Sequence, residues 1–178
     1  MRTRLILTAL LCIPFMNAAA HEEEEHAHEA HAAHVHGAAV LNVFTEDDST
    51  VVLELDSPMI NFISFEHKPG DEKQITEYNS FLKTLSSGIF SGDSAFRINS
   101  EAACFVKGFE HDVEFDDGHG DFELTVTYRC EKIDSLSSIE VNLFKNFPAL
   151  HSISAQVVTE KLQKGFELKA DSHIINLK

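Results

Sequence analysis

Two cysteines and the turn midway between them constrain the fold of this chain more than any other feature. Cys104 and Cys130 lie symmetrically about residue 117, inside the sequence Asp-Asp-Gly-His-Gly, which is typical of a tight turn. Apolar residues, many of them aromatic or β-branched, flank the turn on both sides: Phe105, Val106 and Phe109 before it, and Phe122, Leu124, Val126 and Tyr128 after it. This spacing predicts a β-hairpin that brings the two cysteines side by side as one disulfide.

The register of this hairpin must contain an irregularity. If Cys104 and Cys130 lie directly opposite each other, the apolar residues of the two strands fall on opposite faces, so a β-bulge or a shifted register is required. A metal site built from the two thiolates is the alternative to a disulfide. The sequence has no Cys-x-x-Cys pattern, which argues against redox catalysis.

The first twenty residues are typical of an export signal. Arg2 and Arg4 precede an apolar run, residues 5–15, that is too short to span a bilayer, and small residues ending at Ala20 form a cleavage site. A membrane anchor is the alternative. Cleavage after Ala20 removes Cys12, and export to an oxidising compartment favours a disulfide between the other two cysteines. We therefore expect an exported, soluble chain without membrane insertion.

Short strand-like segments make up most of the remaining chain. Residues 38–44 and 50–56 predict two strands, which the polar residues 45–49 join as a hairpin. Further strand-like segments lie at residues 153–160, 165–169 and 173–177, and a short helical turn is predicted at residues 143–148. The pattern predicts an α+β fold: a single domain, mostly antiparallel β-sheet, with one principal α-helix packed on it.

The principal helix is predicted over residues 71–87. Asp71 can cap its first turn, and Gln74 three residues later completes a capping-box pattern. Gly88 occupies the position of a C-terminal stop. Apolar residues recur at helical spacing and predict a core-facing stripe: Ile75, Tyr78, Leu82 and Leu85.

The charge and the missing motifs restrict the function. The formal net charge is −15 at pH 7, which argues against nucleic acid or an anionic membrane as a partner and favours attraction of cations. The sequence contains no G-x-S-x-G, no H-E-x-x-H and no glycine-rich phosphate loop. We therefore do not expect an enzyme.

Histidine is concentrated at the start of the exported chain. Six of the eleven histidines and five glutamates fall between His21 and His36. The low apolar content of residues 21–33 indicates a segment that does not fold alone. A solvated tail is one interpretation; repeated imidazole beside carboxylate favours metal binding instead, because histidine adds little charge at neutral pH. The tail ligands of lower affinity would be His21, His26, His28 and His31.

His34 and His36 differ from the tail because they lead directly into the first predicted strand. If the strand begins there, the two side chains point to one face, since strand residues alternate. That arrangement places two imidazoles on a rigid support, as a tight metal site requires.

The predicted hairpin tip carries a second group of metal-binding residue types. Residues 110–123 contain seven acidic residues and two histidines. A charged, solvated tip is one interpretation, and a calcium site is another, although no D-x-D-x-D-G loop is present. His111 and His119 favour a softer metal. His67 ends an apolar run before the helix and is a weaker candidate, whereas His151 and His173 stand alone on strand-like segments and are predicted not to be ligands.

Several segments in this order resemble the ZrgA-like periplasmic zinc-binding proteins. The segments are HVHGAAVLNV (34–43), VVLELDSPMINFISFEHKP (51–69), DFELTVTYRCE (121–131), LFKNFPAL (143–150) and GFELKADSHIINL (165–177). The resemblance covers nearly the whole exported chain. It implies zinc capture in the periplasm, in support of zinc import through envelope transporter components. Many members of the family carry a long His/Asp loop in the hairpin; here the loop is short.

The resemblance and the residues together predict a site and a domain layout. His34, His36 and His67 keep the motif positions, and a fourth zinc ligand would come from His111, His119, Asp121 or Glu123. The layout is a signal peptide over 1–20, a flexible His/Glu-rich tail over 21–33 and a zinc-binding, β-rich domain over 34–178.

Two other functions remain open from the sequence. Cleavage after Ala20 would give His21 a free α-amine, and an N-terminal histidine can chelate Cu²⁺ or Ni²⁺, so a copper or nickel handling protein is one alternative. Met59 is the single methionine after the signal, which argues against a thioether Cu(I) site. The second alternative is a non-catalytic adaptor that docks on an envelope transporter.

Overall fold

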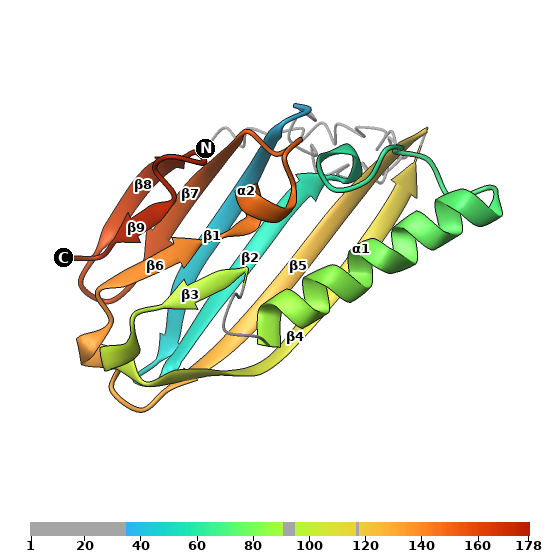
Figure 1. Ribbon diagram of the computed structural model, residues 1–178. Helices are drawn as coiled ribbons and strands as arrows, with labels where there is room; N and C mark the ends of the chain where they lie inside the picture. The colour runs from blue at the N-terminus through green and yellow to red at the C-terminus, as the bar shows by residue number, and fades with distance from the viewer. Residues whose placement is uncertain (1–34, 91–94, 117) are drawn as a thin grey trace, which may run out of the picture. The chain divides into compact units, whose positions relative to one another are not determined.

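A six-stranded β-sheet supports the fold, and a smaller sheet and two helices lie over one of its faces (Figure 1). The computed structural model describes residues 35–90, 95–116 and 118–178, all within the compact unit Ala32–Lys178. The strand order is β4-β5-β2-β1-β7-β8 in the large sheet and β3-β6-β9 in the small one. The predicted single, sheet-rich domain with one main helix is confirmed.

The large sheet contains β1 (Ala38–Asp47), β2 (Thr50–Pro58), β4 (Cys104–Asp116), β5 (His119–Cys130), β7 (Ser152–Val158) and β8 (Gln163–Leu168). The small sheet contains β3 (Phe96–Ile98), β6 (Ser138–Val141) and β9 (Ile174–Asn176). The helices are α1 (Glu72–Phe90) and α2 (Leu143–Asn146), with 3₁₀ turns at Met59–Asn61, Ser100–Ala102 and Ile133–Ser135. None of the described helices has the length and apolar character needed to cross a membrane.

The core lies between the large sheet and the elements that cover it. Along β5, alternate residues are buried, because successive strand side chains point to opposite faces. Phe62 and Phe81 pack against each other, and each also packs against Phe122 on β5 and against Phe147, with centroid separations between 5.0 and 5.8 Å. Each such ring contributes about 1.5–3 kcal/mol through burial. The Tyr128 hydroxyl donates to the Phe96 carbonyl (3.0 Å) and so ties β5 to the small sheet.

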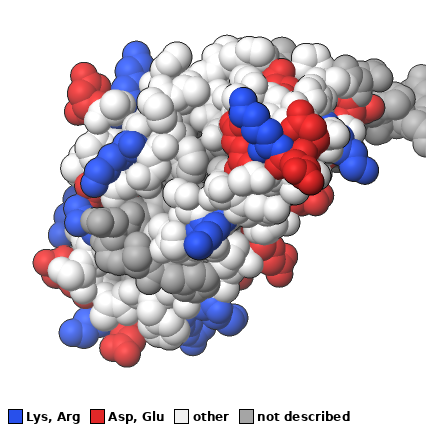
Figure 2. Space-filling model, turned by 45° about the vertical axis from the view of Figure 1, so that its right-hand side comes forward, with Lys and Arg blue, Asp and Glu red and all other residues white. Residues whose placement is uncertain are grey.

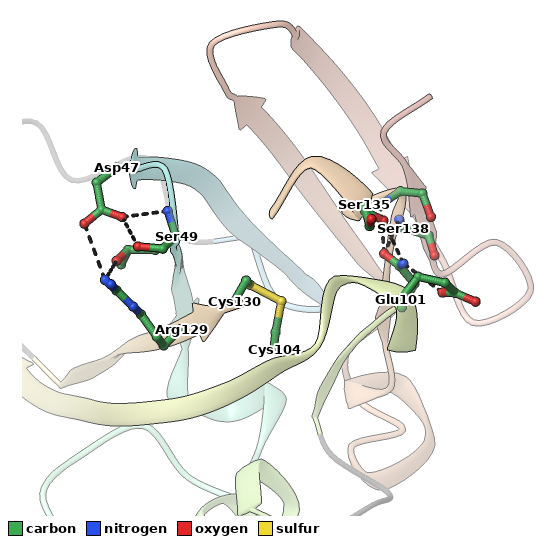
Figure 3. Close-up of a disulfide and its surroundings, with 11 residues drawn as sticks. Asp47, Ser49, Glu101, Cys104, Arg129, Cys130, Ser135 and Ser138 are labelled. Carbon is green, nitrogen blue, oxygen red and sulfur yellow. Dashed lines mark hydrogen bonds and ion pairs between the residues drawn. A yellow bond between two sulfur atoms is a disulfide. The ribbon is translucent and has the colours of Figure 1, made fainter. Parts of the chain in front are cut away.

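The cysteine hairpin has the predicted disulfide and the predicted irregularity. Cys104 and Cys130 are bonded and lie directly opposite each other at the end of the β4–β5 pair (Figure 3). A β-bulge between Val106 and Gly108 then shifts the register by one residue. The bulge returns the apolar residues of β4 to the face that the apolar residues of β5 occupy.

A polar cluster lies beside the disulfide, at the turn between β1 and β2 (Figure 3). The hydroxyl and the backbone N–H of Ser49 both donate to Asp47, at 2.7 and 2.8 Å, and Arg129 Nη1 is 3.7 Å from the same carboxylate. These hydrogen bonds from Ser49 lower the pKa of Asp47 to about 2. The strands run to this turn, so much of the predicted loop 45–49 is strand.

The main helix differs from the prediction in the residue at which it ends and in the residues that face the core. Asp71 caps it as expected, since Asp71 Oδ1 accepts the Gln74 N–H at 2.9 Å. The expected stop at Gly88 is wrong: the helix continues to Phe90, and the Gly88 carbonyl accepts the N–H of Ala95. Ile75 is 48% exposed rather than core-facing. The fully buried positions of the stripe are Phe81, Leu85 and Ile89.

The small sheet was not predicted. β3 and β6 are only three and four residues long, too short for a period-two pattern to stand out. The large sheet also contains one parallel pair, β1 with β7, among its otherwise antiparallel neighbours. This parallel pair places the start of β7 beside the start of β1, two residues after His36.

Candidate metal-binding site

A glycine just before β1 brings three chain segments together at one corner of the large sheet. Gly37 has φ +84°, a left-handed conformation that favours glycine. Its N–H donates to the side-chain oxygen of Asn61 (2.7 Å), and its carbonyl accepts the N–H groups of His151 (2.7 Å) and Ser152 (2.9 Å). Asn61 is buried and also donates to the Ala38 carbonyl (2.8 Å). The backbone that follows His36 is therefore held by its neighbours.

Glu66 lies between two of the predicted metal ligands. His36 Nε2 is 3.1 Å from Glu66 Oε1, and His119 Nδ1 is 3.4 Å from Glu66 Oε2. The Glu66 side chain is only 13% exposed, whereas those of His36 and His119 are 61% and 58% exposed. We refer to His36, Glu66 and His119 as the Glu66 cluster. It presents two solvent-accessible imidazoles on a carboxylate that is largely withdrawn from water.

A second glycine allows this close approach. A Cβ at Gly120 would lie 2.6 Å from the Glu66 carbonyl oxygen and 2.9 Å from the Phe115 ring. Only glycine therefore lets the segment after β2 lie against the start of β5. Because His119 precedes Gly120, this contact also places the His119 ring beside the Glu66 side chain.

One carboxylate oxygen of the cluster lacks a proper partner. Within the described part of the chain, Glu66 Oε1 is buried and makes no well-formed hydrogen bond, although His36 Nε2 is 3.1 Å away. A buried charged oxygen without a full hydrogen bond is costly, so a cation is a favourable partner for it. Among residues 35–90, 95–116 and 118–178, no three His, Cys, Asp or Glu side chains form a ready-made metal-binding group. In the Glu66 cluster, His36 and His119 each contact a different oxygen of the Glu66 carboxylate.

His67 is engaged away from this cluster. Its Nδ1 lies 3.0 Å from the Lys68 carbonyl oxygen, and its Nε2 lies 3.4 Å from Gln74 Nε2 at the first turn of α1. Its ring also packs beside Phe65. The His67 ring therefore makes its contacts at the start of α1. The role of His67 as a metal ligand stays a prediction.

The candidate ligands on the hairpin divide between its two faces. His111 is paired with Leu124, so it lies on the core-facing side, and its ring is near those of Phe109 and Phe122. His119, Asp121 and Glu123 alternate onto the opposite face. Of the predicted fourth ligands, His119 forms an ion pair with Glu66. His34, the tail histidines and the export signal lie outside the described residues.

Sequence reasoning missed Glu66 and discounted His151. Glu66 immediately precedes His67 in the same Phe-Glu-His motif, from which the sequence analysis took only the histidine as a candidate ligand. The backbone N–H of His151 is hydrogen-bonded to the Gly37 carbonyl beside His36. Only the parallel β1–β7 pairing, which joins distant segments, brings His151 to this corner. No local sequence signal could have shown this.

The fold and the cluster define a sheet-rich domain that presents imidazole and carboxylate groups together at one corner. The model of the ZrgA family zinc uptake proteins matches residues 33–177, which is well over half of the chain. The chain belongs to this family, as the sequence resemblance indicated. None of the curated proteins compared with the chain matches it. Zinc uptake is therefore the process in which the protein takes part, and zinc is the metal to test against the Glu66 cluster.

Proposed function

We propose that this protein is a non-catalytic zinc carrier that captures zinc in the periplasm and supports its uptake. The observation that carries the proposal is the buried Glu66 Oε1, which lacks a well-formed hydrogen bond while an imidazole nitrogen lies 3.1 Å away. A zinc ion beside this oxygen would neutralise the carboxylate. The family membership supports zinc as the cargo.

The spacing of the donor atoms supports the same proposal. Zinc–ligand bonds of about 2.0–2.2 Å in a tetrahedron place neighbouring donor atoms about 3.3 Å apart. The two imidazole–carboxylate separations in the Glu66 cluster, 3.1 and 3.4 Å, bracket that value. The same separations suit imidazole–carboxylate hydrogen bonds when no ion is bound, so a small side-chain rotation would exchange the proton for the metal.

The remaining ligands and the tail complete the proposal. The predicted first strand does not include His36: β1 begins at Ala38, and His36 and Gly37 lie in a turn that the Ala38 N–H closes on the Val35 carbonyl. His34 lies two positions before His36 and stays a proposed ligand. The tail histidines His21, His26, His28 and His31 would collect zinc with lower affinity if ordering the segment around the ion costs conformational entropy. They would pass the ion to the folded site. Export through residues 1–20, with delivery to envelope transporter components, is part of the same proposal.

Calorimetric zinc titration of two chains tests the proposal. One begins at His21, the expected mature start, and the other at Ala33, without the tail. We expect the shorter chain to keep one tight site and the longer chain to add weaker sites and to load faster. Loss of tight binding with the tail would contradict a folded site, and equal loading rates would contradict a collecting tail. Binding should weaken below about pH 6, because protons compete for imidazole.

Alanine variants, tested by growth of cells, separate zinc capture from an adaptor function. If the protein only docks on a transporter, alanine at His34, His36 and His67 should leave zinc-dependent growth unchanged. If it captures zinc, those substitutions should impair growth when zinc is scarce. Parallel titrations with Cu²⁺ and Ni²⁺ on the chain that begins at His21 test the copper and nickel alternatives, in which the free α-amine of His21 takes part.

A further inference from the structure

The geometry points to His151 as a further zinc ligand, which approaches the Glu66 cluster from the start of β7. Gly37 would then serve two purposes: it forms the left-handed corner, and it leaves the space that the His151 ring occupies. This inference rests on the proposed function, because it extends the same site. It concerns a residue that the sequence pattern indicated was not a ligand.

The first observation is the position of the ring. A Cβ built on Gly37 would lie 2.6 Å from His151 Nδ1, 3.3 Å from Cγ and 3.5 Å from Cε1. The imidazole therefore lies directly over the α-carbon of Gly37, in the space that a side chain there would fill. The backbone hydrogen bond from the His151 N–H to the Gly37 carbonyl, at 2.7 Å, fixes this approach.

The second observation is reach. Consecutive α-carbons are 3.80 Å apart and a carbon–carbon bond is about 1.5 Å, so His151 Nδ1 lies within about 8 Å of the His36 α-carbon. Histidine ring nitrogens extend several ångströms from their own α-carbon, and zinc adds about 2 Å. This bound places the two residues near enough for both rings to turn toward one ion, and we infer that they do so.

The third observation is that the His151 ring is available. The residue is exposed, and within the described part of the chain no hydrogen bond or ion pair involves its ring nitrogens. His173 differs: its Nδ1 lies 3.0 Å from the Ala170 carbonyl oxygen, and its Nε2 is 3.5 Å from Glu140 Oε1. His151 is thus held through its backbone, while Nδ1 packs over Gly37 and the rest of the exposed ring faces solvent.

The resulting ligand set suits zinc. Imidazoles from His36, His119 and His151 with the Glu66 carboxylate give three nitrogens and one oxygen, a common tetrahedral set. The four residues come from four segments: those before β1, after β2, at the start of β5 and at the start of β7. Zinc binding would therefore join four parts of the large sheet at one corner and raise the stability of the fold.

Cobalt spectroscopy on a cysteine variant tests this inference. The probe is Co²⁺ added to the exported chain carrying His151→Cys, with His173→Cys as the matched control. A thiolate bound to Co²⁺ gives an intense near-ultraviolet charge-transfer band. We expect this band in His151→Cys and not in His173→Cys, and zinc affinity reduced roughly tenfold or more in His151→Ala. Mass spectrometry confirms that the introduced thiol stays reduced.

The outcomes separate this inference from the proposed function. A missing band in His151→Cys, or unchanged zinc affinity in His151→Ala, overturns the role of His151. If His36→Ala still abolishes tight binding in that case, the Glu66 cluster stands and only the inference fails. If His36→Ala and Glu66→Gln also leave tight binding unchanged, the proposed site itself is wrong. A band in His173→Cys would show adventitious thiolate binding and would also overturn the inference.

Discussion

Two regions of the molecule place histidine beside glutamate, and they differ in what else surrounds the carboxylate. In the Glu66 cluster, two imidazoles face a largely buried carboxylate, and no lysine or arginine forms an ion pair with it in the described part of the chain. On the small sheet, His173 faces Glu140, which Arg97 on the paired strand already neutralises. The hydrogen bond from Arg97 holds the pKa of Glu140 below its ordinary value.

The difference shows why the same residue types lead to different chemistry. A carboxylate with an arginine partner has its charge satisfied without a metal, so the imidazole beside it adds little more than a further contact. A carboxylate paired with imidazoles and with no arginine or lysine partner can accept a divalent cation as its counter-charge. We therefore expect zinc at the Glu66 cluster and a structural ion pair at Glu140. Both regions lie within the same compact unit, so one protein sample compares them directly.

The largest expected effect comes from removing each carboxylate charge in turn. Glu66→Gln should weaken zinc binding roughly 100-fold, because it removes a charged ligand and leaves an amide between two imidazoles. Glu140→Gln is the matched control and should leave zinc affinity unchanged. Calorimetric titration of the two variants checks both expectations. Equal loss of affinity in the two variants would remove the distinction between the regions.

A smaller effect is expected from filling the space over the corner glycine. Gly37→Ala should lower the free energy of unfolding by about 1–3 kcal/mol, because alanine disfavours φ +84° and its Cβ would meet the His151 ring. Gly108→Ala is the control, since nothing lies within 4 Å of a Cβ at that position. Urea unfolding measures both. A stability change at Gly37→Ala no larger than that at Gly108→Ala would contradict the proposed role of the corner.

The smallest effect is expected at the ion pair on the small sheet. Arg97→Met should change the free energy of unfolding by no more than about 0.5 kcal/mol, because the Arg97 side chain is 58% exposed. The pKa of Glu140 should rise toward its ordinary value. A carboxyl whose pKa is lowered on folding stabilises the fold above its ordinary pKa, and this contribution is lost as the pH falls. An NMR titration of Glu140 in both chains checks the direction, and an unchanged pKa would show that Arg97 is not the cause.

Local patterns in the sequence predicted the elements whose signals lie close together in the chain. The symmetric cysteines, the glycine-rich turn and the apolar flanks predicted the hairpin, its disulfide and the need for a bulge. The Asp71 cap predicted where α1 begins, since capping depends on residues within one turn. The end of α1 was predicted wrongly: a glycine inside a helix costs only about 1 kcal/mol, and packing of Ile89 offsets it.

The candidate site could be predicted only in part. The sequence singled out His36 and His119 as candidate ligands, but their shared contact with Glu66 depends on the close approach at Gly120. His67 has the right chemistry, yet its ring lies against the first turn of α1. His111 lies on the core-facing side of β4 because the bulge sets which face each residue takes.

The sequence by itself determined that this chain forms a disulfide-closed hairpin within a sheet-rich domain, and that it offers histidine and carboxylate near its start. Those properties follow from neighbours along the chain. The tertiary structure decided which of these side chains meet, because the parallel pairing of β1 with β7 and the glycine contacts at Gly37 and Gly120 join distant segments. A metal site requires convergence of groups within a few ångströms, and only the folded backbone sets distances on that scale.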